Sequence, residues 1–382
     1  MNFLNSIYKT GMLLLAFGLM AACSNLDSDI EKEPFDGATE GGVLILCQGN
    51  LNAGNATLSY YNPDTRTVEN GVFQRANGGA KLGDTGQSVA LHGDKVYVAM
   101  ENSGIVWVLN AATFQVEGKL TVGQTEHMVN PRYIHFLDSP DGRLPSTKAY
   151  ITDLYSPYIT VFNPWTMEYV SSISTGQTAS QGHCSTEQMV QYGDYVFTNC
   201  WSYSNKILVI DTRRDEVCDS LVLGAIQPKS MVVDARGKLW VITDGGYFTA
   251  DGSFGDNIPH LYRIDAATLT VELDQVLDTD EANVFLATNP ARDVLYVINN
   301  DVYRMAMTDS HLPVRPFIEA ERDNNGRRHY LYAMGVDPHN GEIYLADAVD
   351  YSQSGVVYRY AEDGTLLHSF RVGITPCGFA FK

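Results

Sequence analysis

The sequence repeats one pattern of short apolar segments and polar turns about every 45 to 55 residues, a period typical of repeat architectures. Between Tyr195 and Val217, two alternating apolar runs, YVFTN and KILVID, flank the loop WSYSN, which places a Trp and a Tyr among polar residues. The same layout begins again at Lys95, Lys148, Lys238, Val294 and Glu342, and one more strand-like segment precedes each copy. Four short strands per repeat predict an all-β fold of four-stranded antiparallel blades.

The two ends of the repeat region predict how the fold closes. The part that begins at Gly42 supplies only three strands, whereas the chain ends in one spare strand, ITPCGFAFK. If the spare strand completes the first blade, the ring has seven blades and no open sheet edge. We therefore expect a seven-bladed β-propeller over residues 42–382, closed by pairing of the C-terminal strand, 375–381, with the N-terminal strand, 43–48.

The first 41 residues carry export signals rather than a fold. Lys9 precedes the apolar run GMLLLAFGLM, which is too short for a membrane span and is typical of a secretory signal peptide, here residues 1–22. The segment LMAACSN resembles a bacterial lipobox, which implies lipidation of Cys23, as by palmitate. Residues 23–41 are acidic and nearly free of apolar partners, so we expect a flexible tether. Acidic residues after the lipidated Cys resemble a surface-export signal of Bacteroidetes lipoproteins. That resemblance implies a lipid anchor in the outer membrane and exposure at the cell surface.

The net charge of the chain is −19. A surface so acidic repels phosphate backbones, which excludes nucleic acid as an expected partner.

The loops of the predicted propeller differ between its two faces. Turns such as HGDK, YGDY and DTRRD are tight and polar, as hairpins require. The other face gathers the loops between second and third strands and the crossings between blades, where Trp, Tyr and Asn recur. Because binding residues concentrate on loops held by a rigid scaffold, we expect a ligand-binding rim on this face. Its predicted residues are Asn50, Asn102, Tyr155, Tyr158, Trp201, Tyr203, Asn205, Tyr247, Phe248, Asn299, Asn300, Arg328 and Tyr351.

Five cysteines lie beyond the predicted lipid anchor. Aligning the blades on their turns places Cys47 opposite Cys377, and disulfides persist in exported proteins, so we predict a Cys47–Cys377 bridge across the closure. Cys184 and Cys200 lie at the same end of neighbouring strands and form a second candidate pair. Cys218 is left over. The alternative is that all five are reduced core residues.

No sequence motif indicates catalysis. The chain has no nucleophile elbow, no phosphate-binding Gly loop and no metal-spaced His/Cys pair, so we predict no enzyme activity, no catalytic cofactor and no metal site. The alternatives rest on three scattered groups of residues. They are a zinc site among His127, His135, His183 and His329, a calcium site in the loop 244–257, and a lactonase-like channel site of Glu126, Glu187 and Asn283.

The repeats resemble YVTN-type propeller repeats, with YITD at 150, VFTN at 196, YVIN at 296 and LVID at 208. Together with the lipobox, the acidic tether and the aromatic, Asn-rich rim, the chain resembles the BtuG-type cobalamin-binding surface lipoproteins of gut Bacteroidetes. That resemblance implies capture of cobalamin (vitamin B12 and related corrinoids) and its transfer to an outer-membrane TonB-dependent transporter. The resemblance rests on the architecture and on the overall residue pattern of the repeats. Candidates to face the phosphate of the ligand are Arg327, Arg328 or Lys229.

A surface glycan-binding propeller is the alternative, since sugars stack on the same aromatic side chains. The two ligands differ in footprint, because a corrinoid is wide enough to touch loops of most blades, whereas a sugar chain needs one side only.

Overall fold

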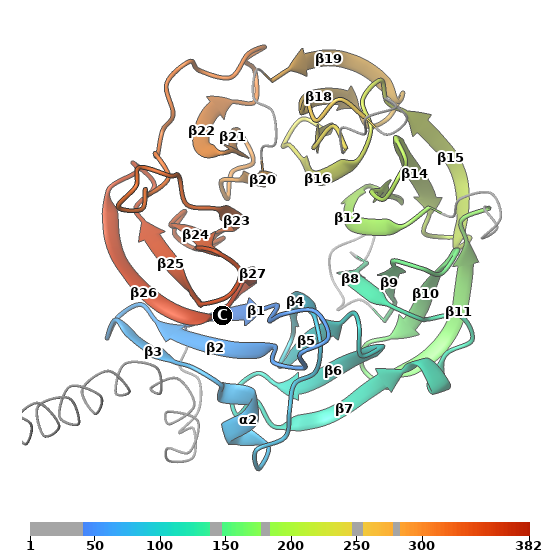
Figure 1. Ribbon diagram of the computed structural model, residues 1–382. Coiled ribbons are helices and arrows are strands. Elements are labelled where there is room, and N and C mark those ends of the chain that lie inside the picture. The colour runs from blue at the N-terminus through green and yellow to red at the C-terminus, as the bar shows by residue number, and fades with distance from the viewer. Residues whose placement is uncertain (1–40, 138–146, 177–183, 247–254, 278–282) are drawn as a thin grey trace, which may run out of the picture.

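The computed structural model describes residues 41–137, 147–176, 184–246, 255–277 and 283–382. The predicted signal peptide, Cys23 and all but the last residue of the predicted tether lie outside the described residues. Seven antiparallel sheets follow one another around a ring, which confirms the predicted seven-bladed propeller (Figure 1). In the described part of the chain, no helix is long and apolar enough to cross a membrane.

Each blade is built outward from the centre of the ring. The innermost strands, from blade 1 to blade 7, are β27 (Pro376–Phe381), β4 (Gly86–His92), β8 (Pro131–Phe136), β12 (Thr186–Tyr192), β16 (Pro228–Val233), β20 (Val284–Thr288) and β23 (Leu331–Val336). The second strands are β1 (Val43–Cys47), β5 (Lys95–Met100), β9 (Ala149–Asp153), β13 (Tyr195–Cys200), β17 (Lys238–Thr243), β21 (Val294–Asn299) and β24 (Ile343–Asp347). The third strands are β2 (Thr57–Asn62), β6 (Ile105–Asn110), β10 (Tyr158–Asn163), β14 (Lys206–Asp211), β18 (His260–Asp265), β22 (Asp301–Ala306) and β25 (Ser354–Tyr360). The outer strands are β3 (Thr67–Glu69), β7 (Val116–Thr121), β11 (Glu168–Ser174), β15 (Glu216–Val222), β19 (Thr270–Val276) and β26 (Leu366–Ile374). Among the described residues, two short helices, α2 (Val72–Ala76) and η1 (Val122–Gln124), lie in connections.

Blade 6 has three strands, and a separate segment takes the outer position. Val302 of β22 forms an isolated bridge with Ile318, whose carbonyl accepts the N–H of Val302 at 2.9 Å. The outer edge of this sheet is therefore partly paired without a regular fourth strand.

The chain ends close the ring as predicted. β27 pairs antiparallel with β1 from Val43↔Phe381 to Leu46↔Gly378, so the first blade takes its innermost strand from the C-terminus. The backbone N–H of Lys382 extends the ladder by one bond, at 3.0 Å to the carbonyl of Gly42. This pairing removes the open edge that an N-terminal blade of three strands would expose.

The core lies between the blades and is filled by a repeated aromatic position. Six second strands place a large ring at the same register, and all six rings are fully buried. They are Tyr97, Tyr150, Phe197, Trp240, Tyr296 and Tyr344. Tyr97, for example, lies in blade 2 and packs edge-on against Phe136 of blade 3, with ring centroids 4.9 Å apart. The aromatic residue at this position of the repeat, as in KVY at 95–97 and KLW at 238–240, thus packs between neighbouring blades.

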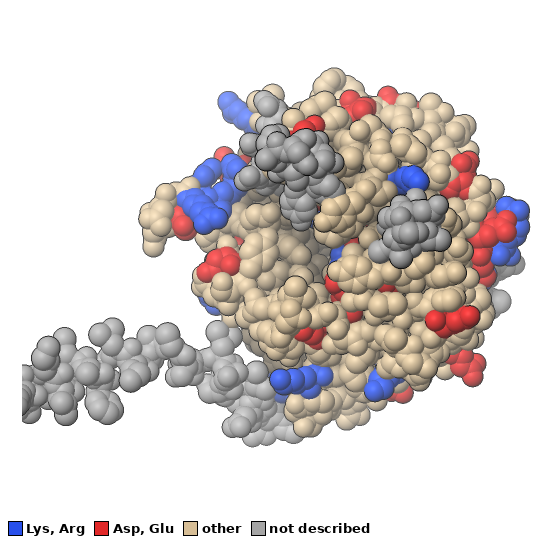
Figure 2. All heavy atoms as spheres, turned by 45° about the vertical axis from the view of Figure 1, so that its right-hand side comes forward, with Lys and Arg blue, Asp and Glu red and all other residues tan. Residues whose placement is uncertain are grey.

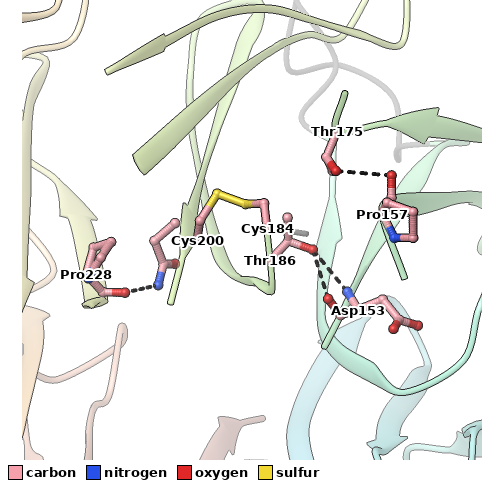
Figure 3. The surroundings of a disulfide bond; sticks show 8 residues. Asp153, Pro157, Thr175, Cys184, Thr186, Cys200 and Pro228 are labelled. Atoms are coloured by element: carbon pink, nitrogen blue, oxygen red, sulfur yellow. Dashed lines mark hydrogen bonds between the residues drawn. A yellow bond between two sulfur atoms is a disulfide. The ribbon is translucent and has the colours of Figure 1, made fainter. Parts of the chain in front are cut away.

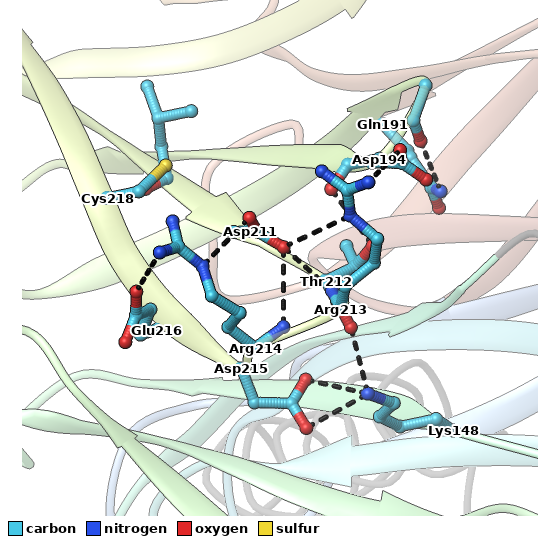
Figure 4. Close-up of polar contacts among 12 residues, drawn as sticks. Lys148, Gln191, Asp194, Asp211, Thr212, Arg213, Arg214, Asp215, Glu216 and Cys218 are labelled. Carbon is cyan, nitrogen blue, oxygen red and sulfur yellow. Dashed lines mark hydrogen bonds and ion pairs between the residues drawn. The ribbon is translucent and has the colours of Figure 1, made fainter.

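One face of the ring, which we call the turn face, carries the tight turns between third and fourth strands. The last residue of the third strand caps several of these turns, because its side-chain oxygen accepts backbone N–H groups two and three residues on, as an Asx turn does. Asp211 does so for Arg213 and Arg214, and its carboxylate also lies 3.0 Å from Nε of Arg214 (Figure 4). The repeated Asn or Asp at this position therefore serves the fold, as expected for plain connectors.

The cysteines correct one prediction and confirm another. Cys184 and Cys200 form a disulfide, which joins the segment just before β12 to the last residue of β13 (Figure 3). Cys47 and Cys377 are free, so the predicted bridge across the closure is wrong. The partner of Cys47 in the ladder is Pro376, after an irregularity between Leu46 and Cys47. Since side chains alternate between sheet faces, a shift of one residue sends the two thiols to opposite faces of the blade.

The surroundings of the two thiols agree with that account. Cys47 is fully buried in a cluster with Tyr344 and Val357 of blade 7. Cys377 lies instead on the side of blade 2, where its thiol is 3.2 Å from the carbonyl oxygen of Gly86.

Candidate functional site

The face opposite the turn face, which we call the loop face, carries exposed aromatic side chains on several blades. Tyr155 of blade 3 is 60% exposed and Tyr203 of blade 4 is 73% exposed. Across the ring, Tyr351 and Tyr330 of blade 7 are both 38% exposed, and their rings pack 5.2 Å apart. Aromatic surface that remains in water on both sides of the ring is suited to contact with a ligand.

Other predicted rim residues hold the loops rather than face solvent. Asn50 donates from Nδ2 to the carbonyl of Tyr351 at 2.6 Å, and Asn205 donates to the carbonyl of Leu223 at 2.8 Å. Asn299 is buried, and Arg328 forms an ion pair with Asp301 at 3.1 Å. The amides of Asn50 and Asn205 therefore hold loops through hydrogen bonds, and the guanidinium of Arg328 is occupied by its ion pair.

The remaining predicted residues divide between the surface and the channel. Asn102 is exposed and donates to Asn52 at 3.1 Å, while Asn300 is half-buried with a left-handed φ of 66°. The ring of Tyr158 stacks on that of His127 at 3.8 Å. Trp201 is half-buried. Tyr247 and Phe248 lie outside the described residues.

The central channel opens on the loop face and is lined there by residues from every blade. Each innermost strand contributes its second residue to the wall of one cavity of about 130 Å³. In ring order from blade 1 these residues are Cys377, Gln87, Arg132, Glu187, Lys229, Phe285 and Tyr332. Figure 2 shows one face of the molecule with a hollow near its centre and mostly uncharged residues around it. We call these seven residues the channel ring.

The channel ring has a charged half, and Arg132 is its centre. The Nε of Arg132 donates to Oε1 of Glu187 at 2.8 Å, and its Nη1 donates to Glu101, which lies on the loop between β5 and β6. The side chains of Arg132 and Glu187 are only 11% and 5% exposed. Three blades are therefore linked by one buried ionic cluster, in which each charge has an opposite partner.

Lys229 extends this cluster onto blade 5. Its ammonium donates to Oδ1 of Asn283 at 2.8 Å, and the amide of Asn283 donates to the carbonyl of Leu331. Burial lowers the pKa of Lys229, against the attraction of Asp244 and Glu187. Burial raises the pKa of Glu187 to about 7, although the neighbouring Arg132 acts in the opposite direction. The protonation of Glu187 is thus balanced near neutral pH.

The other four residues of the channel ring are uncharged, and two of them, Phe285 and Tyr332, are aromatic. Phe285 follows Lys229 around the ring and Tyr332 comes next, and the hydroxyl of Tyr332 donates to Gln48 at 2.9 Å. Tyr133 accepts a hydrogen bond from Gln87 at 3.4 Å. Trp201 joins this cavity to the rim, since its Nε1 donates to Asp244 at 3.1 Å while its ring lies 5.9 Å from the guanidinium of Arg132. Deeper in the channel, a second cavity of about 170 Å³ follows.

The residues that suggested metal or lactonase chemistry lie apart in the structure. Glu126 is 68% exposed and contacts Tyr169 of the outer strand β11, so it is not at the mouth of the channel. His329 pairs with Asp347 at 2.7 Å, and His183 lies outside the described residues. Most of the loop 244–257 also lies outside them. Within the described ranges, no three His, Cys, Asp or Glu side chains are grouped so that they could hold a metal ion.

The channel ring as a whole was not predicted from the sequence, although Glu187, Lys229 and Asn283 were named. The signal was present, because the second residue of each innermost strand can be aligned across the blades. The aligned fragments are TPCG, TGQS, NPRY, STEQ, QPKS, NVFL and YLYA. Their residue types differ from blade to blade, so they do not form a recognisable motif.

Comparisons with known proteins agree with the fold. Residues 41–372 match the family described as Domain of unknown function (DUF5074). Among solved structures, a quinonprotein alcohol dehydrogenase-like protein from Bacteroides thetaiotaomicron superposes with a TM-score of 0.63 at 16% identity, over 90% of this chain and 79% of that one. Hydrazine synthase from Kuenenia stuttgartiensis gives 0.59 at 18% identity, over 77% and 88% of the two chains.

A protein from Lactobacillus plantarum gives a TM-score of 0.62 at 11% identity, over 90% of this chain and all of the other. A search of curated proteins gives no match. At such identities, the structural likeness concerns the fold alone.

Proposed function

This chain belongs to the DUF5074 family, and we propose that it captures cobalamin on its loop face and delivers it to an outer-membrane TonB-dependent transporter. The proposal takes the protein to be a lipid-anchored surface lipoprotein that binds its ligand without chemical turnover. The fold and family support a propeller of unknown function, so the ligand has to be argued from the surface of this chain.

One observation carries the choice of ligand. Exposed aromatic side chains stand on blades 3 and 4, as Tyr155 and Tyr203, and again on blade 7, as Tyr330 and Tyr351. These blades lie across the ring from one another (Figure 1). A sugar chain needs one or two stacking rings on one side, whereas a corrinoid is wide enough to touch both sides at once. The distribution therefore favours the wider ligand.

The chemistry of this face is compatible with a corrinoid. The macrocycle offers a broad apolar surface for Tyr and Trp, which supply rigid contact area at low entropic cost. Its peripheral primary amides both donate and accept hydrogen bonds, as do exposed amides such as that of Asn102. The channel cavity of about 130 Å³ is far smaller than a corrinoid, so the macrocycle would lie over the mouth of the channel.

Calorimetry with cyanocobalamin tests the proposal directly. We expect saturable binding of one cobalamin per protein, and a pink protein after desalting. Binding of dicyanocobinamide, which lacks the nucleotide loop, would then show whether the macrocycle alone is recognised. If cobalamin gives no heat and an oligosaccharide gives saturable heat, the protein is a glycan-binding propeller, and the proposal is wrong. Hydrolysis of a lactone would instead identify an enzyme.

A further inference from the structure

The cavity at the mouth of the channel has polar groups that the fold leaves available. Glu187 uses one oxygen, Oε1, for both contacts with Arg132, at 2.8 Å from Nε and from Nη2. Its second oxygen, Oε2, has no hydrogen-bond donor among the residues that the structure describes. Because the Glu187 side chain is 5% exposed and lines the cavity, this acceptor is directed at a space large enough for a small group.

Lys229 provides the complementary donors. An ammonium carries three N–H groups, and one of them donates to Asn283. In the described part of the chain, the other two have no hydrogen-bond acceptor. Lys229 follows Glu187 in the channel ring, and the two charges lie close enough to affect each other's protonation. The charged half of the cavity thus presents an acceptor beside donors.

The charges around the cavity are already matched, which restricts the charge of a ligand. Of the groups that line the cavity or pair with its Arg132, two are carboxylates, Glu101 and Glu187, and two are cations, Arg132 and Lys229. The carboxylate of Asp244 is not part of this lining, and it accepts from Trp201 and from the backbone N–H of Gly246. Adding a charged group to a buried cluster of this kind leaves one charge without a partner, at a cost of several kcal/mol. A neutral group that accepts from Lys229 and donates to Glu187 avoids that cost. A primary carboxamide has both functions on adjacent atoms.

The aromatic part of the cavity wall indicates which kind of group carries the carboxamide of the ligand. Phe285 of blade 6 and Tyr332 of blade 7 continue the wall of the cavity beyond Lys229, and the space of about 130 Å³ suits a small planar molecule. We propose that the mouth of the channel is a binding site for a small, neutral aromatic carboxamide, held by hydrogen bonds to Lys229 and Glu187 and by contact with Phe285 and Tyr332.

This site is independent of the ligand proposed for the rim. Cobalamin binding can fail while carboxamide binding stands, because the rim residues Tyr155 and Tyr203 do not line the cavity. Carboxamide binding can likewise fail while cobalamin binding stands, because the carboxamide probe is tested without any corrinoid present.

Three probes of the same shape test the proposal on the unaltered protein. Binding of benzamide, benzoate and benzylamine is measured by ligand-observed NMR at pH 8, above the value of about 7 to which burial raises the pKa of Glu187, so that this carboxyl is ionised. We expect benzamide to bind about tenfold more tightly than either charged probe. Equal or tighter binding of benzoate would mean that Lys229 forms an anion site, and tighter binding of benzylamine would mean that Glu187 forms a cation site. Either result, or no binding of benzamide, overturns the proposal.

A pair of variants locates the probe. Lys229→Met removes the donors and should lower benzamide affinity about tenfold or more. Lys206→Met is the matched control, because Lys206 lies at the start of β14 outside this cavity, and it should leave affinity unchanged. Thermal unfolding of both variants confirms that they are folded. Should Lys229→Met fail to fold, the order of the three probes on the unaltered protein still decides the question. Unchanged affinity in a folded Lys229→Met protein would place the probe elsewhere.

Discussion

Arg132 of blade 3 lies 2.8 Å from Glu187 of blade 4, and the pair joins the innermost strands of two neighbouring blades inside the channel. Neither side chain is more than 11% exposed. Burial raises the pKa of Glu187 to about 7 even beside a guanidinium, so desolvation outweighs attraction for this carboxyl. We therefore expect the pair to contribute both to the stability of the ring and to its response to pH.

Loss of Arg132 should be strongly destabilising. Arg132→Met would leave Glu101 and Glu187 buried without a cation between them, and removal of one member of a buried ionic cluster costs about 3–5 kcal/mol. Urea unfolding at neutral pH measures the loss. Arg213→Met is the control, since Arg213 is 62% exposed on the turn face and its ion pairs are expected to contribute about 1 kcal/mol or less. Similar losses in the two variants would contradict the assigned role of Arg132.

Glu187 should make stability depend on pH between about 4.5 and 7. A carboxyl whose pKa is raised by folding binds more protons in the folded chain than in the unfolded chain within this window. The stabilising contribution of its protonated form is full below about pH 4.5 and is lost as the pH rises through 7. Glu187→Gln does not titrate, so its free energy of unfolding relative to wild type should increase across the window.

Urea unfolding at several pH values from 4.5 to 8 tests this. Glu216→Gln, at an exposed position on the turn face, is the control and should follow the wild-type profile. A constant difference between Glu187→Gln and wild type would show that Glu187 is not the titrating group.

The sequence was sufficient for the fold because the fold depends on patterns that repeat. Alternation, turn residues and the spare strand at the C-terminus define seven blades and their closure without knowledge of any single contact. The Cys184–Cys200 pair was also within reach, as two residues at the same end of adjacent strands. The Cys47–Cys377 pair failed because a one-residue irregularity in the ladder, invisible in the sequence, reverses the face of Cys377.

The site was harder to predict than the fold. An Asn in a loop has the same appearance whether it binds a ligand or, like Asn205, ties a loop to its neighbour. Lys229 occupies a polar position in an alternating strand, so the sequence does not distinguish a solvated side chain from one that lines the channel. The channel ring forms because the seven innermost strands place their second residues at the same level of the channel. Residue types alone do not reveal this alignment.

The disulfide should stabilise blade 4. Cys184 and Cys200 are 16 residues apart in the sequence, and a bridge closing a loop of that length contributes about 3 kcal/mol in the chain-entropy model. The double variant Cys184→Ser/Cys200→Ser should therefore unfold at lower urea concentration, and dithiothreitol should bring wild type to the same midpoint. Cys218→Ser removes a free, exposed thiol and should leave stability unchanged. A wild-type midpoint that does not respond to dithiothreitol would argue against the bridge.

Removal of the last eight residues should open the ring. Deleting 375–382 takes away β27, which pairs with β1 and packs its Phe379 and Phe381 against Tyr344 of blade 7. Exposure of this edge and its apolar face should lower the free energy of unfolding by on the order of 5 kcal/mol or more. Deletion of Lys382 alone, which loses a terminal hydrogen bond to Gly42, is the control for end effects. If both truncated proteins melt at the wild-type temperature, β27 does not hold the ring closed.

Two exposed tyrosines provide the sharpest test of the rim. Tyr203→Ala and Tyr155→Ala should each weaken cobalamin binding by about 1–4 kcal/mol, the range for aromatic anchors at an interface. Stability should change little, because both side chains are more than half exposed. Trp201→Ala should also weaken binding, but it breaks the hydrogen bond to Asp244 and so perturbs the channel as well.

Arg213→Ala, on the turn face, is the control for these binding measurements and should bind cobalamin as wild type does. Calorimetry with cyanocobalamin compares all four variants under one condition. If both tyrosine variants bind cyanocobalamin as tightly as wild type does, the corrinoid does not bind on the loop face. A loss in Arg213→Ala equal to that in Tyr203→Ala would place it on the turn face instead, since the two residues belong to the same blade and lie at opposite ends of β14.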